Sequence, residues 1–180
     1  KNFEVIEWMK ETAKKNQVVI CGSLVVWEND NFHNRFFWVE PEGTIFTYNK
    51  KHLFSPGKED EIYKQGESKT LIKYEGLTFC PMICYDLRFP VWIRNKLNNN
   101  KTFEYDILIF VANWPAKRIS HWKQLLIARA IENQAFVIGV NRVGKDENQI
   151  EYNGNSLIID PQGKVIFEAG EEETIKTINL

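Results

Sequence analysis

Residues 79–90 decide how this chain folds, and they read Phe79-Cys80-Pro81-Met82-Ile83-Cys84-Tyr85-Asp86-Leu87-Arg88-Phe89-Pro90. The apolar run that ends at Cys84 predicts a buried strand, and a polar, turn-prone segment follows it at once. We expect this strand to deliver the Cys84 thiol to the start of a helix over about 89–97. Backbone N–H groups at a helix start favour a thiolate and later an oxyanion. Cys84 is therefore a candidate nucleophile, and the alternative is a buried structural cysteine.

Strands dominate the rest of the chain and alternate with two longer helices. A hairpin leads into residues 77–83, and a long polar loop to Ser68 precedes it, of a length that is usually functional. Helical spacing of apolar residues predicts helices over 2–15 and 120–133, the second capped by Ser120. The predicted strands are 18–27 (fully buried), 35–40, 44–48, 70–74, 77–83, 105–112, 136–140, 156–159, 165–167 and 174–178, with a polar loop over 141–152. This order predicts an α/β (α+β) fold with mixed sheets covered by helices.

Composition limits the classes of function. A chain of 180 residues that is 43% hydrophobic and 26% charged is typical of one globular domain. The net charge of -1 gives no basic bias toward nucleic acid or a membrane surface. The three cysteines indicate no disulfide framework and fit a reducing, cytoplasmic compartment. Along a strand, Cys80 and Cys84 would stand about 13 Å apart, too far to bridge. We expect neither a metal nor an organic cofactor.

A cysteine nucleophile needs help, since little of a free thiol is ionised at neutral pH. None of the three histidines, His33, His52 and His121, has a sequence context that marks it as a base. An ammonium and a carboxylate can do the same work by stabilising the thiolate and moving its proton. Lys50 lies where a strand gives way to a loop, and Glu59 lies in the acidic run that follows.

Four motifs together resemble the nitrilase (carbon–nitrogen hydrolase) superfamily, and their residues are most similar to those of the omega-amidase branch. They are Tyr48-x-Lys50-x-His52-Leu53-Phe54, Cys84-Tyr85-Asp86-Leu87-Arg88-Phe89-Pro90, Asn113-Trp114-Pro115 and Ala128-Arg129-Ala130-Ile131-Glu132-Asn133-Gln134. Further matches follow at 141–144, 154–156 and 160–163, so the resemblance covers nearly the whole chain. It implies a four-layer α-β-β-α sandwich, and it implies a homodimer.

The resemblance also implies a mechanism for hydrolysing small ω-amides of the 2-oxoglutaramate or 2-oxosuccinamate type. Cys84 would attack the amide carbonyl, expel ammonia and leave a thioester for water to hydrolyse. Lys50 and the backbone N–H of Tyr85 would stabilise the oxyanion. A supporting carboxylate would orient Lys50, and Glu59 is our candidate, with Asp60 and Glu61 left open as neighbours.

The resemblance further indicates how the substrate is held. Asn113 and Trp114 are expected to form a pocket wall. Arg118 is our candidate for a bidentate contact with the second carboxylate of the substrate. Arg88 is instead expected to pair with a carboxylate near the cysteine as part of the structure.

The sequence departs from the family at its start. The family places its general-base glutamate and a first strand–helix–strand unit upstream of the helix over 2–15, and the glutamates of that helix do not replace the base. We therefore expect a single domain over 1–180 that lacks this unit, with impaired hydrolysis if the chain is complete. Three other interpretations stay open, namely a nitrile or carbamoyl hydrolase, a non-catalytic ligand-binding protein, and a thiol redox protein using Cys80 and Cys84.

Overall fold

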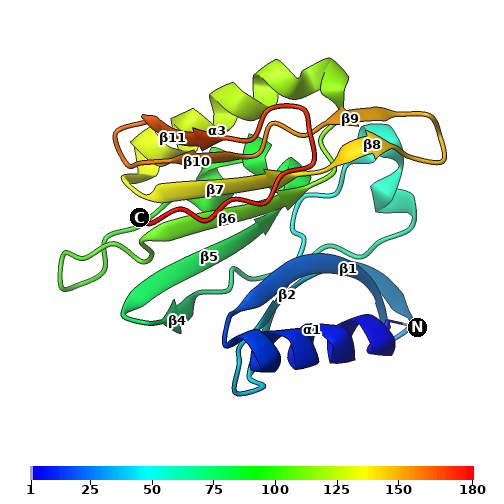
Figure 1. Ribbon diagram of the computed structural model, residues 1–180, viewed down its shortest axis with the longest axis horizontal. Helices are drawn as coiled ribbons and strands as arrows, with labels where there is room; N and C mark the ends of the chain where they lie inside the picture. The colour runs from blue at the N-terminus through cyan, green and yellow to red at the C-terminus, as the bar shows by residue number, and fades with distance from the viewer. Residues whose placement is uncertain (1) are drawn as a thin grey trace.

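Two β-sheets pack face to face in the computed structural model, which describes residues 2–180 (Figure 1). The smaller sheet is antiparallel, in the order β1-β2-β3, and the larger is mixed, in the order β11-β10-β7-β6-β5-β4. β5, β6 and β7 run parallel, and their neighbours β4 and β10 run antiparallel to them. The strands are β1 Ile20–Glu28, β2 Asn31–Val39, β3 Ile45–Asn49, β4 Ile72–Tyr74, β5 Leu77–Ile83, β6 Ile107–Ala112, β7 Phe136–Asn141, β10 Leu157–Ile159 and β11 Val165–Glu168, with a separate hairpin of β8 Val143–Lys145 and β9 Glu151–Asn153.

Helices cover the outer face of each sheet. Helix α1 (Phe3–Asn16) lies on the smaller sheet, where Met9 and Ala13 pack against Phe37 and Val39. Helix α3 (Ile119–Asn133) lies on β7 and β10 of the larger sheet (Figure 1). The order of layers is therefore α-β-β-α, which confirms the predicted sandwich and its mixed sheets.

The main core fills the space between the two sheets. Phe36 and Trp38 of β2 are buried in this core. The ring of Trp38 packs against Phe79 with ring centroids 4.7 Å apart. Burying aromatic rings of this size is a large part of what holds the sheets together. The core therefore holds the two sheets against each other.

Close contact between α3 and β7 depends on Gly139. A Cβ placed on this glycine would lie 2.5 Å from Cδ1 of Leu126 and 2.9 Å from Cζ2 of Trp122. Both of these side chains are fully buried, so they have little room to move. Glycine at this strand position thus allows the helix to sit directly on the sheet.

Several predicted elements differ from the structure. The helix expected over 89–97 is a 3₁₀ segment, η3 (Cys84–Arg88), followed by the four-residue helix α2 (Pro90–Ile93). The N-cap of α3 is Arg118 rather than Ser120, and no side chain caps it by a hydrogen bond. Two short 3₁₀ turns, η1 (Ser55–Gly57) and η2 (Glu59–Glu61), interrupt the long loop after β3, and a third, η4 (Ala116–Arg118), precedes α3.

One loop prediction and two strand predictions also need correction. The region 141–152, expected to be a polar loop, contains most of the β8–β9 hairpin, and 174–178 forms no strand. β1 is not fully buried, because its side chains alternate between half-buried and exposed. Its sequence is apolar on both faces, so composition alone suggested more burial than an edge strand has. Over residues 2–180, no helix combines the length and apolar character needed to cross a membrane.

Candidate active site

Cys84 stands at a sharp bend between β5 and η3. Its backbone φ is +45°, a left-handed conformation that non-glycine residues seldom adopt. Such strain persists only where surrounding contacts impose it, and it is often found at functional sites. The bend exposes part of the Cys84 side chain at the end of an otherwise buried strand. The backbone N–H of Tyr85 lies in the first turn of η3, where N–H groups have no partner within the helix.

Arg129 of α3 holds the segment after the bend from behind. Its Nε and one terminal nitrogen donate hydrogen bonds to the carbonyl oxygen of Leu87, at 3.0 and 2.6 Å. The other terminal nitrogen is 2.9 Å from Oε1 of Glu132, so the buried guanidinium is neutralised. The sequence motif around Arg129 thus anchors the cysteine bend to the helix layer, a role that the motif alone did not reveal.

Lys50 and Glu59 form a short ion pair in the same region. The Nζ of Lys50 lies 2.5 Å from Oε2 of Glu59, and the lysine side chain is only 2% exposed. Glu59 Oε2 also accepts from the N–H of Phe54 at 2.6 Å, and Oε1 accepts from Nδ2 of Asn34 at 3.4 Å. A buried ammonium needs such a partner. Of the three acidic residues at 59–61, Glu59 is therefore the one that reaches Lys50, while Glu61 pairs with Lys58 on the surface.

The Cys84 thiol carries its proton in the resting state. Burial raises the pKa of Cys84, and the positive charge of Lys50 acts in the opposite direction. The charges of Glu59 and Asp86 raise this pKa further, whereas a backbone hydrogen bond with Asn113 lowers it. Burial outweighs the expected help from a helix start, because η3 is short and the site is enclosed. If this sulfur acts as a nucleophile, a base would have to take its proton.

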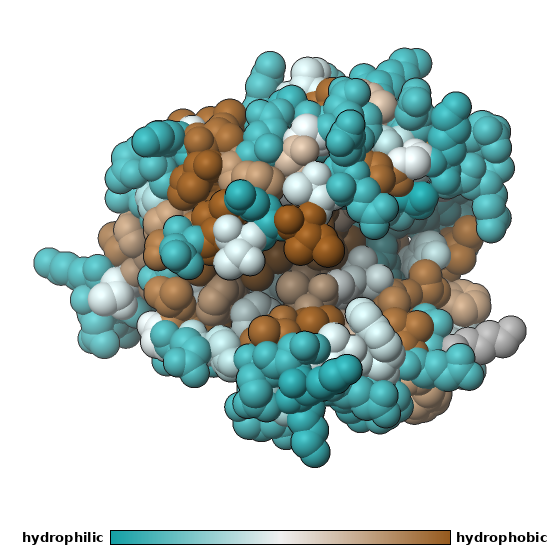
Figure 2. Space-filling model, in the orientation of Figure 1, coloured by the Kyte–Doolittle hydropathy of each residue, from teal (hydrophilic) through white to brown (hydrophobic). Residues whose placement is uncertain are grey.

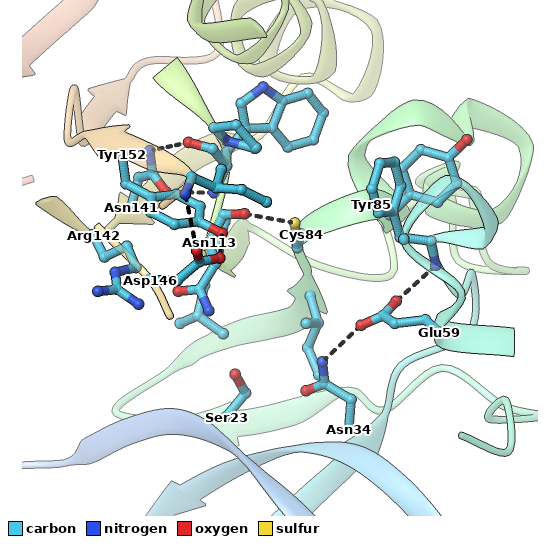
Figure 3. Close-up of a pocket in the computed structure, with 18 of the residues that line it drawn as sticks. Ser23, Asn34, Glu59, Cys84, Tyr85, Asn113, Asn141, Arg142, Asp146 and Tyr152 are labelled. Carbon is cyan, nitrogen blue, oxygen red and sulfur yellow. Dashed lines mark hydrogen bonds between the residues drawn. The ribbon is translucent and has the colours of Figure 1, made fainter. Parts of the chain in front are cut away.

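All seven residues predicted for the site line one cavity of about 560 Å³. They are Lys50, Glu59, Cys84, Tyr85, Asn113, Trp114 and Arg118. Figure 2 shows the cavity as a cleft between the part of the molecule that carries α3 and the part that carries α1. In Figure 3 the sulfur of Cys84 lies between Asn113 on one side and Glu59 on the other. The structure thus brings these residues together, and their chemical roles stay predictions.

Asn113 and Trp114 form a wall that a buried asparagine holds in place. Asn141 accepts a hydrogen bond from the N–H of Trp114 at 2.7 Å and donates from Nδ2 to the carbonyl oxygens of Trp114 and Gly154. The indole N–H of Trp114 donates to the carbonyl of Arg118 at 2.8 Å. Asn113 itself is exposed, so it faces the cavity more than the core. Sequence reasoning matched Asn141 to the family but gave it no role.

Three arginines reach the cavity with different partners. Arg118 lies with its guanidinium carbon 5.2 Å from the ring centre of Phe54, and no hydrogen bond from its guanidinium is found over residues 2–180. Arg142 donates to the carbonyls of Val143 and Lys145. Arg88 does not pair with a carboxylate, contrary to expectation.

The partners of Arg88 explain this difference. Its guanidinium lies over the ring of Trp114 at 5.0 Å and 3.0 Å from Nδ1 of His121. The nearby carboxylate, Asp86, is already saturated by other donors. Arg88 therefore remains a positive charge on the cavity wall.

The described residues offer no cluster of three or more His, Cys, Asp or Glu side chains that could hold a metal ion. The three cysteines are free thiols. Cys80 is buried on the face of β5 that is turned toward the helices, whereas Cys21 is exposed on β1.

Two amidases are similar to this chain in sequence. The sequence is 44% identical over 173 residues to the omega-amidase YafV of Escherichia coli K12. This match covers 96% of this chain and 65% of that protein. It is 42% identical to the 2-oxoglutaramate amidase of Bacillus subtilis, over 93% of this chain and 64% of that protein. The chain thus spans about two thirds of the length of these relatives.

The fold is found in solved structures as well. The CN-hydrolase superfamily protein XC1258 from Xanthomonas campestris, which carries an arsenic adduct in its active site, superimposes with a TM-score of 0.92 at 40% identity, covering 94% of this chain and 65% of that one. Saccharomyces cerevisiae Nit3, a member of branch 10 of the nitrilase superfamily, gives a TM-score of 0.83 at 26% identity, covering 95% and 62%. The carbon-nitrogen hydrolase family profile matches residues 1–180. The chain therefore belongs to the carbon-nitrogen hydrolase family.

Proposed function

We propose that the protein to which this chain belongs hydrolyses the amide bond of small ω-amides and releases ammonia. Cys84 is the nucleophile, Lys50 and the N–H of Tyr85 stabilise the oxyanion, and Glu59 orients Lys50 and assists proton movement. The observation that carries the proposal is the position of Cys84, which stands on a strained bend in a cavity that also holds the Lys50–Glu59 pair. The names of the relatives, omega-amidase and 2-oxoglutaramate amidase, favour this class of substrate.

The reaction proceeds in two steps. The Cys84 sulfur bonds to the amide carbonyl carbon as its proton passes to a base, and the carbonyl oxygen becomes an oxyanion. The C–N bond then breaks, the nitrogen takes a proton and leaves as ammonia, and a thioester remains. Water attacks the thioester carbon, releasing the carboxylic acid and returning a proton to the thiol. Lys50 is suited to stabilise both oxyanions because its buried charge is fixed by Glu59.

The charge of the cavity favours an anionic amide. Its lining carries more cationic than carboxylate side chains: Lys50, Arg88, Arg118 and Arg142 against Glu59 and Asp146. Asp146 is also occupied by the N–H groups of Asn148 and Ile150 and the hydroxyl of Tyr152. Arg118 has the guanidinium donors least engaged by the protein, so we assign it the distal carboxylate of the substrate.

The test of the reaction is ammonia release from 2-oxoglutaramate and 2-oxosuccinamate, with a nitrile and an N-carbamoyl compound in the same panel. Cys84→Ala should abolish release, while Cys21→Ser, which removes an exposed thiol outside the cavity, should not change it. Intact mass should detect an acyl adduct of the chain that is absent from Cys84→Ala. Ammonia release that survives Cys84→Ala would disprove the assignment.

The test of substrate binding is Arg118→Gln. A charge-assisted hydrogen-bonded contact contributes about 1.5–3 kcal/mol, so KM should rise about 10- to 150-fold with a smaller change in kcat. Lys117→Gln removes a charge from the exposed residue beside it and should leave KM unchanged. An equal effect of the two substitutions would mean that only the overall charge attracts the substrate.

A further inference from the structure

A fully buried carboxylate lies directly behind the nucleophile. Asp86 is 0% exposed and belongs to the 3₁₀ segment that begins with Cys84. Its Oδ2 accepts from the hydroxyl of Tyr48 at 2.8 Å and from the N–H of Ile83 at 3.0 Å. Its Oδ1 accepts from both the N–H and the ring Nδ1 of His52, each at 2.9 Å. These four hydrogen bonds replace the water that the buried carboxylate loses, so its burial does not destabilise the fold.

The donors to Asp86 come from two different sheets. Lys50 follows β3 of the smaller sheet and is flanked by Tyr48 and His52, each two residues away. Cys84 follows β5 of the larger sheet and stands two residues before Asp86. Over residues 2–180, the hydrogen bonds that join segment 48–54 to segment 83–89 all end on Asp86.

The main chain of Lys50 is otherwise fixed to its own side of the cavity. Its N–H donates to the carbonyl of Asn34 in β2 at 2.9 Å, and its carbonyl accepts from the N–H of Gly66 at 2.8 Å. Neither contact sets its distance from Cys84. Sheet packing is apolar and therefore non-directional, whereas hydrogen bonds to a carboxylate fix both distance and angle.

We propose that Tyr48 and His52, through Asp86, are positioning residues that set the placement of the Lys50 ammonium against the Cys84 sulfur. This cluster of Tyr48, His52 and Asp86 touches neither the substrate nor the reacting atoms, and it acts by joining the two sheets at the cavity floor. The inference rests on the proposed function for the roles of Lys50 and Cys84.

The local chemistry supports a fixed rather than adjustable contact. Burial, reinforced by the charge of Asp86, raises the pKa of Tyr48 far above its ordinary value, so its hydroxyl keeps the proton that it donates. The same hydroxyl accepts from the N–H of Lys51 and from the indole N–H of Trp92. The imidazole of His52 stacks on Phe89 with ring centroids 3.7 Å apart and an angle of 6° between the planes. With a carboxylate as its acceptor, Nδ1 must carry the proton.

The first experiment compares two equally buried tyrosines. Tyr48→Phe removes the hydroxyl that donates to Asp86, whereas Tyr105→Phe removes a hydroxyl that donates to the carbonyl of Ile93, away from the cavity. Each tyrosine is 1% exposed, but the Tyr48 hydroxyl makes three hydrogen bonds and the Tyr105 hydroxyl one, so Tyr48→Phe should lose more stability. The two kcat values are therefore compared at a temperature well below the unfolding transition of either variant. We expect Tyr48→Phe to lower kcat for the ω-amide about 10- to 100-fold with KM changed by less than about threefold. Tyr105→Phe should change kcat by less than about twofold.

The second experiment separates the hydrogen bond of His52 from its stacking. His52→Phe keeps a ring against Phe89 but has no donor, and it should lower kcat like Tyr48→Phe. His52→Asn loses the stacking but places an amide N–H near the former Nδ1, and it should recover most of the loss. The His52 side chain is 21% exposed, so its replacement should disturb folding less than that of Tyr48. The His52 variants therefore still test the proposal if Tyr48→Phe does not fold.

A third measurement needs no substrate. The rate of Cys84 alkylation by iodoacetamide at neutral pH, followed by peptide mass mapping, should fall several-fold in Tyr48→Phe and His52→Phe, because the lowering effect of Lys50 on the thiol pKa weakens. It should not fall in Tyr105→Phe. This readout survives even if the wild-type chain hydrolyses no ω-amide, a result that would count against the proposed function alone. Equal losses in Tyr48→Phe and Tyr105→Phe, or no recovery in His52→Asn, would overturn the positioning role.

Discussion

Replacing Glu59 with glutamine tests the most specific contact of the cavity. The substitution keeps the size of the side chain but removes the charge that lies 2.5 Å from the Lys50 ammonium. It also weakens the acceptor for the N–H of Phe54 at 2.6 Å. Because Lys50 is 2% exposed, its charge would be left buried without a counter-ion.

The expected loss of stability follows from that burial. Breaking a buried ion pair costs about 3–5 kcal/mol, and the 20% exposure of Glu59 places this pair at the lower end, near 3 kcal/mol. For a domain of this size, that loss lowers Tm by about 6–12 °C. We also expect the rate of amide hydrolysis to fall at least about 100-fold, because Lys50 loses its orientation and the site loses a proton acceptor.

Glu61→Gln is the matched control for this change. Glu61 belongs to the same 3₁₀ turn but is 63% exposed, and its partner Lys58 is 3.6 Å away on the surface. Exposed pairs contribute about 0–1 kcal/mol, so Tm should fall by no more than about 4 °C and the rate should not change. Thermal unfolding and ammonia release of the two variants measure both effects. Similar losses in Glu59→Gln and Glu61→Gln would refute the assignment of Glu59 as the partner of Lys50.

Two further predictions concern the thiol and the sheet. The pH dependence of Cys84 alkylation should show a thiol pKa above the ordinary cysteine value. Lys50→Met should raise this pKa further, because the lysine charge lowers it. A lower thiol pKa in Lys50→Met would contradict this account. The folded state thus favours the neutral thiol, and any stability from it is lost as the pH rises through the raised pKa. Gly139→Ala should lower the free energy of unfolding by about 1–3 kcal/mol, since the new Cβ would lie 2.5 Å from Leu126. The control Gly22→Ala meets no atom within 4 Å and should lower it by less than about 0.5 kcal/mol. Chemical denaturation measures both values.

Local patterns in the sequence were sufficient for most of the fold. The apolar run before Cys84 and the one over 105–112 predicted β5 and β6 of the larger sheet, because long buried stretches leave a strong composition signal. The helical spacing over 120–133 predicted α3 to within one residue at each end. The motifs around Lys50 and Cys84 identified the family, which the whole-chain match and the relatives confirm.

The predictions failed where the local sequence signal was weak or where contacts with other segments decide the structure. The helix after Cys84 is short because Phe89, the residue before Pro90, breaks it from η3 and the extended backbone of Arg94 ends it after Ile93. The β8–β9 hairpin has few apolar residues, so its polar sequence resembled a loop. Arg88 was expected to find a carboxylate, but Tyr48, His52 and Ile83 already occupy Asp86.

By itself, the sequence determined which residues could carry the chemistry: a cysteine at a strand end, a lysine at another, and an acidic run between them. Only the tertiary structure decided that Glu59 reaches Lys50, that burial keeps the Cys84 thiol protonated, and that Asp86 joins the two sheets. The physical reason is that sequence patterns report periodicity and composition along one chain. Ion pairing, hydrogen bonding and desolvation depend instead on distances between segments that lie far apart in the chain, as Tyr48 and Asp86 do at 38 residues.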